Sequence, residues 1–283
     1  MAPLIWKNGE FLQLPASVDF RLLVIDSWRH RCGKTFGLGQ HAARFSAAVA
    51  SMGSALSEQQ WRNIWLGISG ILSSPENLSR ELFPRISLLE CEGGTRHIGF
   101  EIRQAPAVRT TTTLAYYAGE DRRVAPVLKG PDLALFAELK AGVASNVDDL
   151  IISDTDGACL ETTTGALALW KDDVLVLSDR LNKQLPSVTL YQIFMRARER
   201  GKRIEFAPIF PDDLAAGPVW FLNALHGISP VTQIHMQDMI ITPPRHADED
   251  EWTTWWWAQF GARAGNCEHP DLSARIRQER RRT

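Results

Sequence analysis

Three short segments between residues 127 and 189 contain residue types that together could hold a cofactor. Lys129 lies in the segment VLKGPD, and Glu161 opens the segment ETTTGAL. The third segment, LPSVT at residues 185–189, comes at the start of a predicted helix. A desolvated lysine can form a Schiff base, and a carboxylate can keep a ring nitrogen protonated. Hydroxyls and N–H groups at a helix N-terminus can bind a phosphate. The series therefore predicts a site for pyridoxal 5'-phosphate.

Each of these residues has a plainer interpretation when it is taken alone. A lysine before a helix usually faces solvent, a glutamate at the end of a strand is usually a surface charge, and a serine or threonine before a helix is usually an N-cap. The order and spacing of the segments are what favour a shared site, because Glu161 follows Lys129 by 32 residues and the hydroxyl segment comes next.

Hydrophobic spacing predicts the elements that must position these residues. IWKNGEFLQL predicts a hairpin that turns at Asn8-Gly9, and SEQQWRNIWLGISGIL predicts a helix that opens with a capping box of Ser57 and Gln60. PRISLLECEG, RHIGFEIRQAP and TTTTLAYYAG resemble three strands of one antiparallel sheet. Lys129 is expected at the junction of a strand and a helix that has Pro131 in its first turn.

These elements predict an α+β protein of two domains, a small α/β domain of residues 1–120 and a larger cofactor-binding domain of residues 121–283. The tryptophan-rich segment WTTWWWAQF, near the end of the chain, predicts either internal packing or a subunit interface.

Composition argues against several other classes of protein. The formal net charge of −2 gives no reason to expect binding to nucleic acid or to a membrane. No apolar run reaches the roughly 18 residues of a membrane span, and the start of the chain lacks the layout of a signal peptide. The four cysteines (Cys32, Cys91, Cys159 and Cys267) lie far apart. Their spacing favours reduced thiols in a cytoplasmic protein over a disulfide framework or a metal site.

On these motifs the chain resembles the class IV aminotransferases, which are fold-type IV pyridoxal-phosphate enzymes. They include branched-chain and D-amino-acid aminotransferases and aminodeoxychorismate lyase. The resemblance runs from NGEF to NALHGISPV and is carried by GLGQHAARF, LKGPDL, DDLIISDTDGACLETTTGALALW, LPSVTL and LNALHGISPV. It implies a small N-terminal domain, a larger C-terminal domain with a mixed, barrel-like sheet, and a homodimer.

The resemblance also implies roles for individual residues. Lys129 would be the Schiff-base lysine and the base that moves the Cα proton, and Glu161 would hold the pyridine nitrogen. The other cofactor-binding residues would be Arg44, Thr163, Thr164, Val188, Thr189 and Ala224. For the substrate carboxylate, Arg103 is the first candidate because arginine binds a carboxylate through two parallel hydrogen bonds. The further substrate candidates are Arg31, His30 and Leu225.

Three positions depart from the family pattern and keep the alternatives open. Ala166 stands where the family usually has asparagine, and Leu190 stands where it usually has arginine or lysine. Ala134 stands where the branched-chain enzymes have a tyrosine near the cofactor's phenolic oxygen, so Asp132 is the nearest polar candidate for that contact. The first hypothesis is a transaminase that moves an amino group between an amino acid or amine and a keto acid. The alternatives are an aminodeoxychorismate-type lyase that releases pyruvate, suggested by NAL, and a family member without catalytic activity. D or L preference stays open.

Overall fold

The computed structural model describes residues 3–260, which divide into two compact units. Among the described residues, the first unit contains 3–106, 129–131 and 257–260, and the second contains 107–128 and 132–256. The three residues that begin at Lys129 therefore belong to the first unit, while their neighbours in sequence belong to the second. The predicted domains, 1–120 and 121–283, stay a prediction, because a domain folds by itself and compactness alone does not test that.

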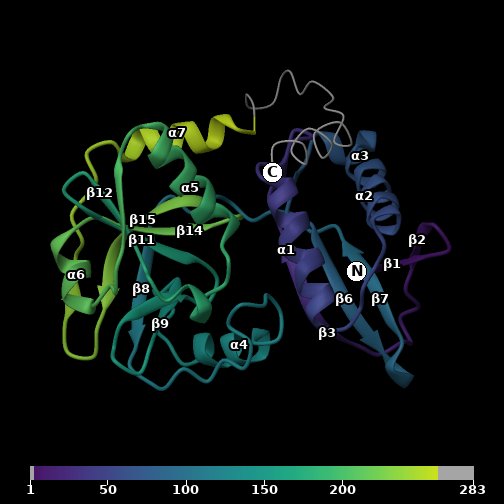
Figure 1. Cartoon of the computed structure of the whole chain (residues 1–283), viewed down its shortest axis with the longest axis horizontal. Coiled ribbons are helices and arrows are strands. Elements are labelled where there is room, and N and C mark those ends of the chain that lie inside the picture. Colours follow the sequence, from purple (N-terminus) through teal and green to yellow (C-terminus); the bar gives the residue numbers. More distant parts are fainter. Residues whose placement is uncertain (1–2, 261–283) are drawn as a thin grey trace. The chain divides into compact units, whose positions relative to one another are not determined.

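A five-stranded antiparallel sheet is the main β element of the first unit, with the strand order β2-β1-β7-β6-β3 (Figure 1). The predicted hairpin is confirmed, and Asn8 and Gly9 in its turn have φ of 55° and 90°. Positive φ at both central residues is the reason that such turns favour Asn-Gly. The strands are β1 Leu4–Lys7, β2 Glu10–Gln13, β3 Phe20–Ser27, β6 Arg85–Cys91 and β7 Arg96–Glu101.

Two long helices complete the first unit, and α1 packs against β3 while α2 packs against β2 (Figure 1). The predicted capping box is confirmed. The Ser57 hydroxyl accepts from the Gln60 N–H at 3.2 Å, and the Gln60 side chain accepts from the Ser57 N–H at 2.8 Å. The elements are α1 Leu38–Ser51, α2 Glu58–Leu72, α3 Pro75–Leu78, the 3₁₀ turn Glu92–Gly94, and the paired short strands β4 His30–Arg31 and β5 Glu81–Leu82.

The second unit is built on a nine-stranded mixed sheet with the order β10-β9-β8-β15-β14-β11-β12-β13, and β16 pairs with β15. β8 is parallel to β9 and β15, β12 is parallel to β13, and the other pairs are antiparallel. The strands are β8 Thr112–Tyr117, β9 Asp149–Ser153, β10 Cys159–Thr162, β11 Ala166–Lys171, β12 Val174–Leu177, β13 Arg203–Phe206, β14 Val219–Asn223, β15 Gly227–His235 and β16 Ile240–Ile241.

The position of β8 corrects one expectation. The sequence predicts TTTTLAYYAG as the third strand of an antiparallel sheet with β6 and β7, and this is wrong, because β8 lies between β9 and β15 in the larger sheet. Alternating side chains specify a strand but not its partner. The ten residues 102–111 that separate β7 from β8 are also too long for a hairpin turn that would fix the pairing.

The strand predicted just before Lys129 is also absent from the structure. β8 ends at Tyr117, and the chain then runs through turns, one of them closed by the Leu128 N–H on the Ala125 carbonyl at 2.9 Å. Pro126 lacks the N–H that a strand ladder needs, which favours the turn. The following helix, α4 Leu133–Ala141, begins after its N-cap residue, so Pro131 precedes the helix.

The remaining helices lie on or beside the second sheet, and α5 packs against β11, β13 and β14 (Figure 1). Their bounds are α5 Val188–Glu199, α6 Pro211–Ala216, α7 Glu249–Ala258 and the 3₁₀ turn Leu181–Lys183. The packing interpretation of the tryptophan-rich segment is confirmed for Trp252 and Trp256, which are buried. The Trp252 ring centroid lies 5.5 Å from those of Trp170 and Trp220.

Cys32, Cys91 and Cys159 are free thiols, and Cys267 lies outside the described residues. Burial is the main reason that the pKa of Cys159 is raised to about 12, and the charge of Asp213 adds to it. Within residues 3–260, no helix is both long and apolar enough to cross a membrane, and no group of three or more His, Cys, Asp or Glu is arranged to hold a metal ion.

Candidate active site

Lys129 is fixed through its main chain to the edge of the first sheet. Its carbonyl accepts a hydrogen bond from the Ile25 N–H of β3 at 2.7 Å. The next residue, Gly130, has a φ of 134°, and a Cβ there would lie 2.8 Å from the Cα of Val24. Only glycine fits this conformation and this close approach. The Gly-Pro turn therefore anchors the lysine's backbone on β3.

A buried carboxylate near the end of β3 ties together two residues of α1. Asp26 is fully buried and accepts from His41 Nδ1 at 2.8 Å. It also accepts from Arg44 Nε and Nη2, each at 2.9 Å, so that the guanidinium binds both carboxylate oxygens. The predicted phosphate ligand Arg44 is therefore held in one orientation by an aspartate that the sequence reasoning did not single out.

The charges of this cluster set the protonation states of Asp26 and His41. Burial alone would raise the pKa of Asp26, but the charge of Arg44 and the hydrogen bonds from Arg44 and His41 lower it well below its ordinary value. Burial is the main reason that the pKa of His41 is lowered, and the charges of Arg44 and Lys129 act in the same direction, against that of Asp26. His41 is therefore neutral near pH 7 and donates from Nδ1 to an ionised Asp26.

The structure connects Arg103, the first candidate for the substrate carboxylate, to the same cluster. Its Nη2 donates to the Ser27 hydroxyl and its Nε to the Phe83 carbonyl, both at 3.0 Å, while the Ser27 N–H donates to Asp26 at 2.7 Å. Burial lowers the pKa of Arg103 to about 10, helped by the charge of Arg85. The side chain thus remains cationic at neutral pH, and its role in substrate binding stays a prediction.

The other substrate candidates in the first unit, Arg31 and His30, have contacts outside the cluster around Asp26. Arg31 forms an ion pair with Glu81 at 3.1 Å, and its guanidinium carbon lies 5.9 Å from the Trp257 ring centroid. Arg29 shares Glu81 through a second ion pair at 2.5 Å. His30 is buried against the Thr35 hydroxyl at 3.0 Å, and burial lowers its pKa to about 4. The substrate role of Arg31 also stays a prediction.

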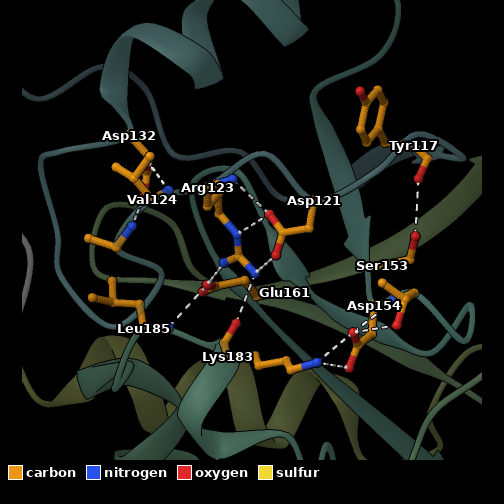
Figure 2. Close-up of polar contacts among 12 residues, drawn as sticks. Tyr117, Asp121, Arg123, Val124, Asp132, Ser153, Asp154, Glu161, Lys183 and Leu185 are labelled. Atoms are coloured by element: carbon orange, nitrogen blue, oxygen red, sulfur yellow. Dashed lines mark hydrogen bonds and ion pairs between the residues drawn. The ribbon is translucent and has the colours of Figure 1, made fainter.

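In the second unit, Glu161 on β10 is a buried carboxylate held by two donors (Figure 2). One carboxylate oxygen, Oε1, accepts from Arg123 Nη1 and from the Leu185 N–H, the latter at 3.0 Å. Arg123 also binds both oxygens of Asp121 at 2.9 Å and the Lys183 carbonyl at 2.8 Å. One partner of Glu161 is therefore an arginine that the sequence reasoning missed.

The N-terminus of α5 follows Leu185 in the chain and has the predicted cap. The Ser187 hydroxyl accepts from the Leu190 N–H at 3.2 Å, and Val188 and Thr189 form the first turn and are buried. The first N–H groups of a helix have no acceptor within the helix, and its dipole favours an anion there. These two residues can therefore donate backbone N–H groups to a phosphate.

The threonines after Glu161 are arranged differently from the expectation. The hydroxyls of Thr162, Thr163 and Thr164 all donate to Asp149, the first at 3.2 Å, and the Thr164 N–H donates to it at 3.1 Å. Thr163 and Thr164 thus direct their hydroxyl protons to a buried carboxylate, and what they offer to a ligand is the remaining lone pairs. Their role as cofactor ligands stays a prediction.

The predicted loop of Ala224 and Leu225 is shaped by Asn223. The Asn223 side chain accepts from the N–H groups of Leu225 and His226, at 3.1 and 2.8 Å, and donates to the Thr164 carbonyl at 3.3 Å. Asp132, the other polar candidate, accepts from the Val124 and Ala125 N–H groups at 2.9 and 3.2 Å and so stabilises a turn (Figure 2).

The predicted residues thus fall into two sets. The first unit holds Arg31, Arg44, Arg103 and Lys129, and the second holds Glu161, Thr163, Thr164, Val188, Thr189, Ala224 and Leu225. Within the second, Leu185 connects Glu161 to the start of α5, and Asn223 connects Thr164 to the loop at Ala224. The residues that sequence reasoning missed are Asp26, Arg123, Asp149 and Asn223. Their only signal was a charged or polar side chain beside a predicted residue or strand.

Comparison with known proteins agrees with this assignment of segments. Residues 100–234 match the model of the amino-transferase class IV family. This region is similar to the class IV aminotransferases. The resemblance expected from the sequence is therefore confirmed. The matched region includes Lys129, Glu161 and the start of α5, as well as Ala224. No curated protein sequence matches the chain.

Solved structures that are similar to most of this chain show its fold. A fold IV transaminase from Curtobacterium pusillum is 19% identical, with a TM-score of 0.71 over 93% of this chain and 100% of that one. A 4-amino-4-deoxychorismate lyase from Pseudomonas aeruginosa is 16% identical, with a TM-score of 0.72 over 89% and 97%. A hypothetical aminotransferase from Mycobacterium tuberculosis, solved with α-ketoglutarate and PMP bound, is 16% identical, with a TM-score of 0.75 over 92% and 99%. The predicted fold class, fold-type IV with a mixed, barrel-like sheet, is confirmed.

Proposed function

We propose that the chain is a pyridoxal-phosphate-dependent aminotransferase that moves an amino group between an amino acid or amine and a keto acid. The observation that carries this proposal is Glu161, a buried carboxylate held by Arg123 and by the Leu185 N–H. A pyridine nitrogen needs such a carboxylate, and the capped start of α5, which follows Leu185, offers the N–H groups that a phosphate needs. The donors and acceptors present therefore fit the cofactor.

In this proposal each residue has a defined task. Pyridoxal phosphate, when bound, supplies an electron sink for the substrate's α-carbon. Lys129 Nζ would hold the cofactor at its aldehyde carbon and, once the substrate's amine has displaced it, would carry the proton that leaves the substrate's α-carbon, while its main chain stays anchored at Ile25. Glu161 would hold the proton on the ring nitrogen. The phosphate would be held by Arg44, Thr163, Thr164, Val188, Thr189 and Ala224, and the substrate carboxylate by Arg103, Arg31 and Leu225.

A half-reaction screen tests the proposal directly. Purified protein that is reconstituted with pyridoxal phosphate should gain a visible absorption band, and an amino donor should shift that band and yield a keto acid. Lys129→Ala should abolish both changes, because it removes the amine that is assigned to the cofactor's aldehyde. Lys7→Ala, at an exposed lysine, is the matched control. Turnover of a donor by Lys129→Ala at the wild-type rate would show that the assigned mechanism is wrong.

The lyase alternative rests on the loop that Asn223 orders, because NAL resembles the lyase branch of the family. A coupled pyruvate assay with aminodeoxychorismate and no keto-acid acceptor separates the two reactions, since only a lyase releases pyruvate without an acceptor. Unchanged spectra across a panel of D- and L-amines would instead favour the non-catalytic alternative. The same panel would report D or L preference.

Two further expectations stay predictions. The homodimer implied by the resemblance can be checked by size-exclusion chromatography with light scattering. The cytoplasmic location expected from the cysteine pattern can be checked by cell fractionation.

A further inference from the structure

The contacts of Glu161 point to a residue that would control the cofactor without touching it. We propose that Arg123 is a positioning residue, which holds Glu161 ionised and in one orientation so that the cofactor's ring nitrogen stays protonated. This inference rests on the proposed function, because it assigns Glu161 to the ring nitrogen. It adds an arginine through which that contact is set.

Geometry supports this role first. The Arg123 side chain is 1% exposed and its guanidinium is held on three sides, by Asp121, by the Lys183 carbonyl and by Glu161 (Figure 2). A guanidinium is planar and its donors are rigidly arranged, so a side chain that is fixed by Asp121 and by the Lys183 carbonyl offers Glu161 a fixed donor direction. Glu161 Oε1 receives that donor together with the Leu185 N–H, and the carboxylate is thereby oriented.

Charge supports it second. Burial opposes the charge of Arg123, but the hydrogen bond to Asp121 and the charge of Glu161 raise the pKa of this guanidinium above its ordinary value. Arg123 is therefore a cation throughout the neutral pH range. A permanent cation beside a buried carboxylate favours its ionised form. A carboxylate that stays ionised does not take up the proton between it and the cofactor's ring nitrogen. That proton therefore remains on the nitrogen.

The adjacent arginine, Arg122, has different surroundings, so the proposed role depends on position 123 and not on arginine in this segment generally. Arg122 is 47% exposed and pairs with Glu138, also exposed, at 2.9 Å. It has the same charge and the same place in sequence to within one residue, but it binds a surface carboxylate. Arg122→Met is therefore a matched control for Arg123→Met, since each removes one arginine from adjacent positions of the same segment.

The test measures the dissociation constant of pyridoxal phosphate for cofactor-free protein between pH 6 and pH 9. Arg123→Met should weaken binding near pH 7 by about 10–100-fold, which corresponds to one charge-assisted hydrogen bond. Without the guanidinium, Glu161 takes up a proton as the pH falls, so the ratio of variant to wild-type affinity should recover as the pH rises. Arg123→Lys, which keeps the charge, should bind more tightly than Arg123→Met, with a ratio independent of pH. Arg122→Met should bind like the wild type.

A double-mutant cycle separates positioning from simple structural support. If Arg123 acts through Glu161, then Arg123→Met in the Glu161→Gln background should cost less than about threefold in affinity, because the group that it controls is already neutral. An equal loss in both backgrounds would overturn the inference and leave Arg123 as a structural tie between Asp121 and Lys183. If Arg123→Met does not fold, as judged by its thermal unfolding, Arg123→Lys serves in the same cycle.

The outcomes also separate this inference from the function beneath it. Wild-type protein that fails to bind pyridoxal phosphate would overturn the proposed function and this inference together. Wild-type binding combined with an Arg123→Met affinity ratio that does not change with pH would overturn the inference alone.

Discussion

Asp26 in the first unit and Asp149 in the second are both 0% exposed, and the protein holds them by different means. Asp26 receives the guanidinium of Arg44 and the imidazole of His41. Within residues 3–260, the groups that hold Asp149 are the hydroxyls of three threonines and backbone N–H groups. One carboxylate is neutralised by a cation, and the other is solvated by hydroxyls in the way that water would solvate it. The two sites should therefore respond differently when the charge is removed.

The largest effect is expected for Asp26→Asn. The substitution removes the charge of Asp26 from Arg44, whose side chain is 14% exposed, and breaking a largely buried pair costs about 3–5 kcal/mol. Urea unfolding of the two proteins measures the difference in the free energy of unfolding. Ser46→Ala, on the exposed side of α1, is the control and should change stability little. A loss below about 1 kcal/mol for Asp26→Asn would break the comparison, because it would show that Arg44 does not depend on this carboxylate.

A smaller loss is expected for Asp149→Asn. The substitution removes a buried charge and leaves no cation behind, and the threonine hydroxyls can turn to accept from the new amide. We expect a cost of about 1–2 kcal/mol from weakened hydrogen bonds. The same urea titration measures it. If Asp149→Asn proved more damaging than Asp26→Asn, hydroxyl solvation would be the stronger way to hold a buried carboxylate here, and the comparison would be reversed.

The smallest expected effect is a difference in response to acid. The pKa of Asp26 is below its ordinary value of 3.8 in the folded protein, so the unfolded chain binds the proton first. The stability that this carboxylate contributes is fully present above pH 3.8 and declines as the pH falls below that value. The gap in the free energy of unfolding between wild type and Asp26→Asn should shrink by about 0.7 kcal/mol between pH 3.8 and pH 3. Chemical denaturation at both pH values would measure it, and a constant gap would contradict it.

Local patterns predicted much of this molecule because their causes are local. The turn at Asn8-Gly9 and the capping box of Ser57 and Gln60 depend on residues within four positions of one another, and both are confirmed. The start of α5 after Ser187 belongs to the same class. Long-range pairing has no such signal. β8 has the same alternation whichever sheet it joins, so its place between β9 and β15 was not predictable from its own residues.

The candidate site shows the same limit. Lys129 and Glu161 were found because the order of segments resembles a family, but Arg123 was not, because RR in the sequence does not reveal which arginine is buried. The turn that places Lys129 was mistaken for a strand because apolar residues precede it. Its real anchor, the Ile25 N–H, lies more than one hundred residues earlier in the chain.

The bond between Ile25 and Lys129 has a consequence for the solubility of fragments. β3 is an outer strand of the five-stranded sheet, and the short segment from Lys129 to Pro131 covers one of its exposed N–H groups. Open strand edges pair readily with other chains. A truncated chain that ends at Pro106 would keep every strand of this sheet but leave that edge uncovered. We expect such a fragment to aggregate, and the short segment that carries Lys129 then also protects the sheet from self-association.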